Sequence, residues 1–210
     1  MTNFLLIRHG LHVFGSDRLA GRTPGIDLSR DGREQAEQLA QRLEGVQLHA
    51  IYCSPIDRTV QTHEPLAARQ GLTSTVSEAL VEIDYGDWTG RTLDELAAMD
   101  EWQRWNSFRS GTRVPNGESM LEIQARVVAE MQRLAAVHVD QNVALVSHGD
   151  VIKAALAYAL GVPLDLFQRI EISPASVSVL QLAHYGPWVL CVNNTGDLGE
   201  LPVFAPPPGD

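Results

Sequence analysis

Positive charge and cysteine are both scarce in this sequence of 210 residues. Sixteen lysines and arginines stand against 26 aspartates and glutamates, so the net charge is −10. Nucleic acids and anionic membrane surfaces bind to dense positive faces, and the acidic balance therefore argues against both as partners. Two cysteines, Cys53 and Cys191, are too few for a disulfide framework or a zinc ribbon. We expect both to be buried free thiols.

Long hydrophobic runs are missing as well. Apolar runs such as 4–7 and 143–146 fall far short of the ~18 residues that a membrane-spanning helix needs. The N-terminus enters an apolar run directly, without the charged region and long hydrophobic region of a secretory signal peptide. These features predict a cytoplasmic protein with no transmembrane helix. The hydrophobic content of 44% and the chain length are typical of one folded α/β domain.

Short apolar runs alternate with helical patterns along the chain. Runs at 4–7, 50–53 and 143–146 are each followed by a segment with helical spacing of apolar residues. This alternation predicts an α/β fold, a three-layer sandwich in which a mainly parallel central sheet carries helices on both faces. Two late strands at 177–182 and 188–192 are expected to form an antiparallel edge.

Local signals place the helices. The pattern predicts helices after Ser29, near Ile56, over 93–105, from Ser119 with a capping box to Glu122, and over 150–160. Pro65 is expected to kink or divide the second of these, because proline lacks the N–H that a helix interior requires. Residues 78–90 read as irregular.

Charged side chains and histidines follow the three apolar runs. Arg8-His9-Gly10 follows the first, Arg58 lies a few residues after the second, and His148-Gly149 follows the third. The carboxyl ends of parallel strands meet at one edge of a sheet, where α/β proteins bind ligands, so these side chains are expected to converge. Arginine forks bind the oxygens of a dianion and an imidazole can act as nucleophile. The pattern therefore predicts a phosphate site, in which glycine after each histidine lets the backbone approach the ligand.

Six ordered blocks of sequence resemble the histidine phosphatase superfamily, also called phosphoglycerate mutase-like. The blocks that carry this resemblance are Leu5-Leu6-Ile7-Arg8-His9-Gly10; Gly21-Arg22-Thr23 with Leu28-Ser29 and Gly32; Ser54-Pro55 with Arg58-Thr59 and Thr62; Glu82 with Tyr85-Gly86 and Trp88-Thr89-Gly90; Gly117-Glu118-Ser119 with Arg126; and Ser147-His148-Gly149.

The resemblance implies a mechanism. By analogy with the family, His9 takes the phosphoryl group, Arg8, Arg58 and His148 hold its oxygens, and Glu82 serves as general acid and then as base. No metal and no cofactor are expected, since arginine and histidine supply the positive charge. Further phosphate or substrate contacts are expected from Gly10, Gly15, Arg22 and Gly149. Many family members have asparagine where this chain has Gly15, whose backbone is expected to replace that contact. His12 is interpreted as a loop residue.

The resemblance also suggests how the chain is organised. We expect a single domain over residues 1–201 with a segment at about 86–117 that covers the site, followed by a Pro-rich tail at 202–210.

The acidic excess lies entirely within 71–210, since 1–70 sum to zero charge. A positive pocket inside an acidic envelope favours small phosphorylated substrates over polyanions, with inorganic phosphate as the product.

Several functions remain open at this stage. The favoured function is phosphomonoester hydrolysis through a phosphohistidine. A 2,3-bisphosphoglycerate-dependent phosphoglycerate mutase is the alternative with the same chemistry, although the covering segment is short for a mutase. A non-catalytic phospholigand-binding protein and a zinc hydrolase using His9, His148 and Asp150 are weaker alternatives. The organic part of the substrate and the oligomeric state are not specified by the sequence.

Overall fold

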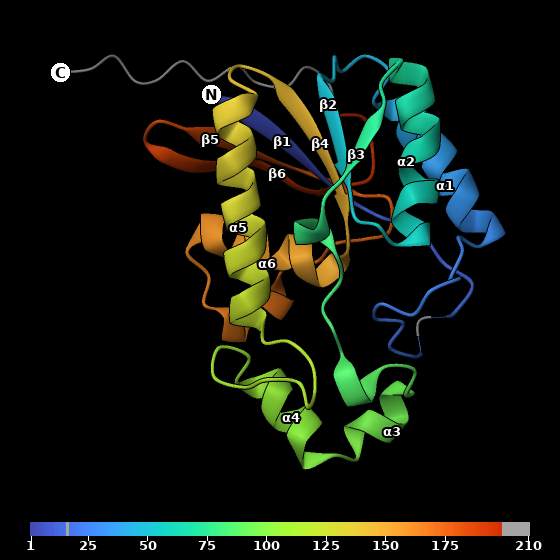
Figure 1. Ribbon diagram of the computed structural model, residues 1–210, viewed down its shortest axis with the longest axis vertical. Coiled ribbons are helices and arrows are strands. Elements are labelled where there is room, and N and C mark those ends of the chain that lie inside the picture. The colour runs from blue at the N-terminus through green and yellow to red at the C-terminus, as the bar shows by residue number, and fades with distance from the viewer. Residues whose placement is uncertain (16, 199–210) are drawn as a thin grey trace.

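The computed structural model describes residues 1–15 and 17–198, and its strands form one twisted sheet (Figure 1). The order across the sheet is β3-β2-β4-β1-β5-β6. The strands are β1 (Thr2–Arg8), β2 (Ala50–Cys53), β3 (Ser74–Val76), β4 (Asn142–Ser147), β5 (Val177–Ala183) and β6 (Gly186–Asn194). The pairs from β3 to β1 are parallel, whereas β1–β5 and β5–β6 are antiparallel. The predicted antiparallel edge is therefore confirmed.

Helices cover both faces of this sheet. They are α1 (Arg30–Arg42), α2 (Asp57–Gln70), α3 (Leu93–Ala97), α4 (Asp100–Ser107), α5 (Met120–Val137) and α6 (Gly149–Leu160), with short 3-10 helices η1 (Glu78–Leu80), η2 (Gly86–Trp88) and η3 (Leu164–Arg169). In Figure 1, α1 and α2 lie together on one side of the sheet, and α5 and α6 on the other. The α/β sandwich expected from the sequence is confirmed.

The alternation of side chains along β1 builds two separate cores. Phe4 and Leu6 pack in the cluster formed with α5 and α6, while Leu5 and Ile7 pack in the cluster formed with α1 and α2. Successive residues of a strand point to opposite faces, so a strand with helices on both sides needs an unbroken apolar run. This requirement explains why the first run of the sequence has no polar residue.

Strand register brings the functional edge of the sheet together. Arg8 pairs with Ser147 at the end of β1 and β4, and Cys53 of β2 pairs with Val146. The three strands therefore end level with one another, and the residues that follow them start from the same edge. The sequence-based expectation that these residues converge rests on this register.

Several local predictions need correction. Pro65 lies inside one continuous helix, α2, and does not divide it. The helix expected over 93–105 is two helices, because the backbone of Met99 is extended, with φ −98° and ψ 126°. Strand β3 was not predicted, since its three residues give too short a pattern. Cys53 is buried and Cys191 only half-buried, and both are free thiols.

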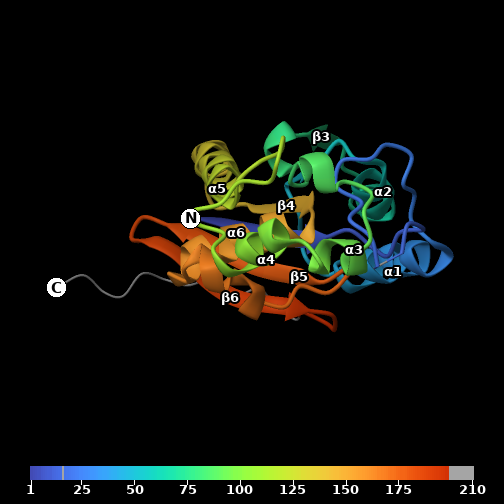
Figure 2. The same cartoon turned by 90° about the horizontal axis from the view of Figure 1, so that it is seen from below.

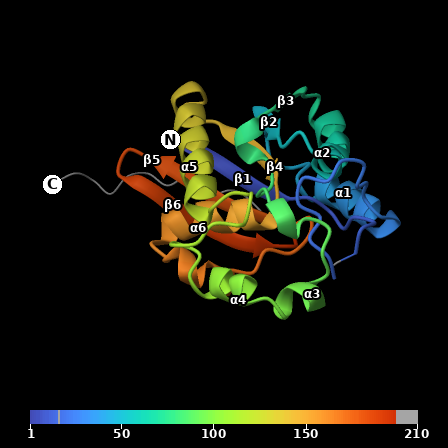
Figure 3. The same cartoon turned by 60° about the horizontal axis from the view of Figure 1, so that its bottom comes forward.

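The segment at 86–117 lies below the sheet in Figure 1, and Figure 2 shows α3 and α4 across that end of the molecule. Its backbone bonds to the loop after β1: the Leu19 N–H donates to Arg91 O, and the Leu93 N–H donates to Asp17 O. Figure 3 shows α3 beside this loop. The segment thus supports the loop that borders the site. The expected tail at 202–210 lies outside the described residues.

Trp88, Trp102 and Trp105, all within this segment, pack against one another. The ring centroid of Trp88 lies 5.3 Å from that of Trp102 and 5.6 Å from that of Trp105. Trp88 and Trp105 are almost fully buried, so these tryptophans belong to the core. Within 1–15 and 17–198, no helix is both long enough and apolar enough to cross a membrane.

Gly32, in α1, provides a test of how closely this helix packs against the loop after β1. A Cβ at this position would lie 1.8 Å from the carbonyl oxygen of Leu11, two residues after His9. The backbone must move to accept it, so we expect Gly32→Ala to lower the free energy of unfolding by roughly 2 kcal/mol despite the higher helix propensity of alanine. Urea unfolding measures this change. The matched control is Gly45→Ala, where nothing lies within 4 Å; equal stability of the two variants would contradict the close approach.

Candidate active site

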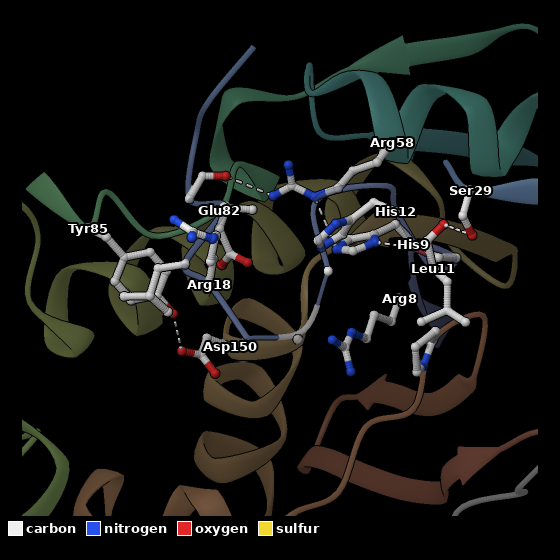
Figure 4. Close-up of a pocket in the computed structure, with 17 residues that line it drawn as sticks. Arg8, His9, Leu11, His12, Arg18, Ser29, Arg58, Glu82, Tyr85 and Asp150 are labelled. Carbon is white, nitrogen blue, oxygen red and sulfur yellow. Dashed lines mark hydrogen bonds between the residues drawn. The ribbon is translucent and has the colours of Figure 1, made fainter. Parts of the chain in front are cut away.

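The ends of β1, β2 and β4 border a cavity of about 450 Å³. Of the residues predicted to act in catalysis or to bind phosphate, those that line it are Arg8, His9, Gly10, Gly15, Arg58, Glu82 and Gly149. Figure 4 shows Arg58, His9 and Arg8 on one side of this cavity and Glu82 on the other. His148 and Arg22 are placed behind this lining and act on it through hydrogen bonds, as the following contacts show.

His9 is held as a neutral imidazole with one defined tautomer. Its Nδ1 lies 2.8 Å from the carbonyl oxygen of Gly10, which can only accept, so Nδ1 carries the proton. Its Nε2 accepts from Arg58 Nε at 3.2 Å. Burial, and then the charges of Arg58 and Arg8, hold the pKa of His9 well below its usual value. The lone pair of Nε2 is therefore available at neutral pH.

Two arginines present unused donors beside this lone pair. Arg58 is buried and donates through Nη2 to Gly21 O at 2.8 Å, while its Nη1 has no partner among the described residues. Arg8 donates to Ile172 O through Nη1, and its buried Nε likewise has no partner there. Buried N–H groups without partners cost free energy, and charged donors of this kind bind phosphoryl oxygens strongly. The pair is therefore suited to a bound dianion.

His148 fixes the position of Arg58. Its Nδ1 lies 3.2 Å from Arg58 Nη2, and its Nε2 lies 2.8 Å from Ser54 Oγ. Because the guanidinium can only donate, Nδ1 accepts and Nε2 carries the proton. Burial and the Arg58 charge hold the pKa of His148 well below its usual value. Its ring centroid is 5.2 Å from that of His9, so a second neutral imidazole stands directly beside the first.

Glu82 is the carboxyl group that faces His9 across the cavity (Figure 4). Its Oε1 accepts from the Ile83 N–H at 3.0 Å, and its Oε2 lies 3.8 Å from His148 Nδ1. Burial and the negative charge of Asp150 raise the pKa of Glu82 to about 7. A carboxyl group with this pKa can donate a proton and take one back near neutral pH.

Arg22 holds the backbone at Glu82. Its Nε donates to Glu82 O at 2.7 Å, and its Nη2 donates to Glu118 Oε2 at 2.6 Å. Arg126 donates to Ala79 O at 2.6 Å and lies 3.7 Å from the same Glu118 oxygen. The two arginines thereby fix the position of the backbone around Glu82. The sequence suggested that Arg22 contacts phosphate. In this structure its guanidinium contacts Glu82 O and Glu118.

The glycines after the two histidines have close protein neighbours. A Cβ on Gly10 would lie 2.6 Å from Gly32 O, and one on Gly149 would lie 3.4 Å from Arg8 Nε. Both glycines allow the site to pack against itself, a reason that sequence reasoning did not give. Gly15 has a φ of 82°, in the left-handed region that favours glycine.

Several residues that line the cavity had no role in the favoured phosphatase mechanism. Tyr85 and Asp150 are joined by a hydrogen bond of 2.9 Å between the Tyr85 hydroxyl and Asp150 Oδ2. His12, interpreted as a loop residue, also lines the cavity, with its ring centroid 5.5 Å from that of His9. The position of Asp150 directly after His148-Gly149 was a signal that could have been used. No cluster of three or more metal-ligating side chains occurs among the residues that the structure describes.

Comparisons with known proteins agree with this geometry. A sequence model of the histidine phosphatase superfamily (branch 1) matches residues 4–195. The chain is 31% identical to phosphoserine phosphatase 1 of Hydrogenobacter thermophilus, over 98% of both chains. It is 28% identical to a Yersinia pestis protein named "Probable phosphoglycerate mutase GpmB", over 96% of this chain and 95% of that one. A crystal structure of phosphoserine phosphatase from Entamoeba histolytica in complex with 3-phosphoglyceric acid has 25% identity and a TM-score of 0.84, covering 94% of this chain and 100% of that one.

Proposed function

This chain belongs to the histidine phosphatase superfamily, branch 1, and from that membership we propose that it hydrolyses small phosphomonoesters through a phosphohistidine on His9. The observation that carries the proposal is the neutral His9, whose Nε2 lone pair stands beside the unpartnered donors of Arg8 and Arg58. Phosphoryl transfer depends mainly on positioning and on stabilising charge. These three side chains supply both.

In the first step, His9 Nε2 attacks phosphorus. The N–P bond forms while the bond from phosphorus to the leaving oxygen breaks, and that oxygen takes the proton of Glu82. Arg58 gives up its contact with Nε2 to the phosphoryl oxygens, while His148 keeps the guanidinium in place through Nδ1. Arg8 binds the same oxygens from the other side. The arginines thus neutralise the phosphoryl group as it moves.

In the second step, the Glu82 carboxylate takes a proton from water. The water oxygen forms a bond to phosphorus, the N–P bond breaks, and inorganic phosphate leaves with His9 neutral again. One group serves as acid and then as base because its pKa of about 7 allows both states near neutral pH. Glu82 is therefore returned to its starting form after each turnover.

We propose further that this chemistry is independent of metal ions and takes place in the cytoplasm. The guanidinium groups of Arg8 and Arg58 bear the positive charge that Mg²⁺ bears in other phosphoryl-transfer sites. Free thiols at Cys53 and Cys191 are compatible with a reducing compartment. Hydrolysis is favoured over the mutase reaction because the chain is similar to phosphoserine phosphatases over nearly its whole length. The resemblance to the Yersinia pestis protein keeps the mutase as the second candidate.

The test is phosphate release from a panel of phosphomonoesters, including p-nitrophenyl phosphate, in excess chelator. We expect turnover that the chelator does not reduce. With 3-phosphoglycerate and catalytic 2,3-bisphosphoglycerate, free phosphate should form faster than 2-phosphoglycerate. A dominant flux to 2-phosphoglycerate would establish the mutase instead, and binding without any turnover would identify a phospholigand-binding protein.

A further inference from the structure

The cavity wall opposite Arg8 and Arg58 carries the carboxyl groups of Glu82 and Asp150 together with the guanidinium of Arg18. Arg18 donates through Nη1 to Gly90 O at 3.3 Å. Figure 4 shows Tyr85, Glu82 and Asp150 on one side, facing His9 and Arg8 on the other. When Glu82 holds its proton for the first step of hydrolysis, Asp150 is the remaining carboxylate of this wall. A phosphoryl group bound to the arginines therefore directs the organic part of the substrate into a space that Asp150 borders.

Asp150 keeps part of its carboxylate free. Its Oδ2 accepts from the Tyr85 hydroxyl at 2.9 Å and lies 3.9 Å from Arg109 Nη1. Its Oδ1 makes no hydrogen bond to the residues at 1–15 and 17–198, and the side chain is 15% exposed. Asp150 lies in the first turn of α6, where the helix N-terminus stabilises a negative charge. The carboxylate is thus oriented by the protein without being fully bonded by it.

Arg109 is packed behind Asp150 and does not line the cavity. Its guanidinium lies 3.6 Å above the centre of the Trp105 ring and 4.7 Å from that of Phe167. Its Nη2 donates to Asn106 Oδ1 at 2.6 Å, and the residue is 1% exposed. Arg109 therefore balances Asp150 from behind, at a distance too long for a hydrogen bond. Because Asp150 lines the cavity, its second carboxylate oxygen can accept a donor from a bound ligand.

We propose that Asp150 binds an ammonium group in the organic part of the substrate, so that the enzyme acts on phosphomonoesters of amino alcohols or hydroxy amino acids. This inference rests on the proposed phosphatase function. An ammonium group offers a charged donor to the carboxylate, whereas an anionic or apolar group would leave Asp150 with an unfavourable neighbour. The substrate then offers a phosphoryl group to Arg8 and Arg58 and an ammonium group to Asp150.

The experiment compares substrates that differ only in this group. Phosphoethanolamine and 2-hydroxyethyl phosphate differ by an ammonium against a hydroxyl, and phosphoserine and 3-phosphoglycerate differ in the same way but add a carboxylate. For the wild-type enzyme, kcat/KM should be at least about tenfold higher for the ammonium member of each pair, a preference typical of a charge-assisted contact. A preference in the second pair alone would restrict the class to hydroxy amino acids.

The variant Asp150→Asn separates recognition from catalysis. Asparagine can still accept from Tyr85, and any change in the pKa of Glu82 affects both members of a pair alike, because both release an alkoxide. The ratio within each pair should fall to within about twofold of one, as expected when the charge-assisted contact is lost. The matched control is Asp100→Asn, an exposed acid in the first turn of α4, which should keep the wild-type ratio.

The outcomes are distinct. Wild-type ratios below two in both pairs overturn the proposal whatever the variant does, and so does a high ratio that survives in Asp150→Asn. Failure of the phosphatase function itself would be seen separately, as absence of turnover with p-nitrophenyl phosphate, which has neither group. Turnover of that compound together with ratios near one would leave the phosphatase standing and remove the role of Asp150.

Discussion

The variant His9→Ala should lose at least about 10³-fold in kcat for every phosphomonoester, since removal of a covalent nucleophile leaves only binding and charge stabilisation. His9 Nε2 is the lone pair that stands beside the free donors of Arg8 and Arg58, and alanine offers no substitute. Phosphate release under saturating substrate measures the loss. Because alanine removes the acceptor of Arg58 Nε, the arginine is released for the substrate, so affinity for inorganic phosphate should be retained.

The control for this variant is His184→Ala. His184 is exposed between β5 and β6 and contacts the ring of Tyr185, so its loss should leave kcat within about twofold, as for surface substitutions in general. If His9→Ala kept activity within tenfold of the wild type while binding phosphate normally, water would be attacking phosphorus directly. The covalent mechanism would then be abandoned.

The variant Glu82→Gln should separate substrates by their leaving groups. For alkyl phosphates, whose alkoxide needs a proton, kcat/KM should fall by about 10²- to 10⁴-fold, the usual contribution of a general acid. For p-nitrophenyl phosphate, whose leaving group departs unprotonated, the first step should change little and hydrolysis of the phosphoenzyme should become limiting. A burst of p-nitrophenol measures this difference. An equal loss on both substrate types would rule out the role as acid.

The pH profile tests the same residue. Burial and the charge of Asp150 raise the pKa of Glu82 to about 7, so the protonated, donating form disappears as pH rises. With alkyl phosphates, kcat/KM should therefore decline above about pH 7, and Glu82→Gln should abolish that limb. Because the pKa of His9 lies well below its usual value, no loss attributable to its protonation is expected near pH 6.5. A wild-type profile that rises from pH 7 to 9 would contradict the assignment.

Much of the fold follows from local sequence signals because those signals agree with the tertiary packing. Ser119 and Glu122 form the predicted capping box at the start of α5, and Gly161 ends α6 in the left-handed conformation. Pro65 misled the prediction because a single missing N–H is tolerated inside a helix that packs firmly on a sheet, with Leu66 fully buried. The break at Met99 has no strong breaker residue, so periodicity alone could not reveal it.

The residues of the site could likewise be predicted only in part. Residues that directly follow a strand, such as His9 and His148, could be placed from the sequence because strand ends share an edge. Tyr85 and Asp150 could not be paired, since they lie 65 positions apart and meet through one hydrogen bond. The support that Arg22 gives to Glu82 could not be predicted, because its contacts with Glu82 O and Glu118 depend on how the loop folds. Motifs identify chemical groups, whereas contacts decide which of them touch the substrate.

The most direct test of the account is to look for the phosphoenzyme itself. Glu82→Gln should be mixed with p-nitrophenyl phosphate, quenched in alkali, which preserves phosphohistidine, and digested for mass spectrometry. We expect one added phosphoryl group on the peptide that contains His9, stable in base and lost in acid, and absent from the double variant with His9→Ala. Turnover with no phosphorylated peptide, or phosphate found on a residue other than His9, would contradict it.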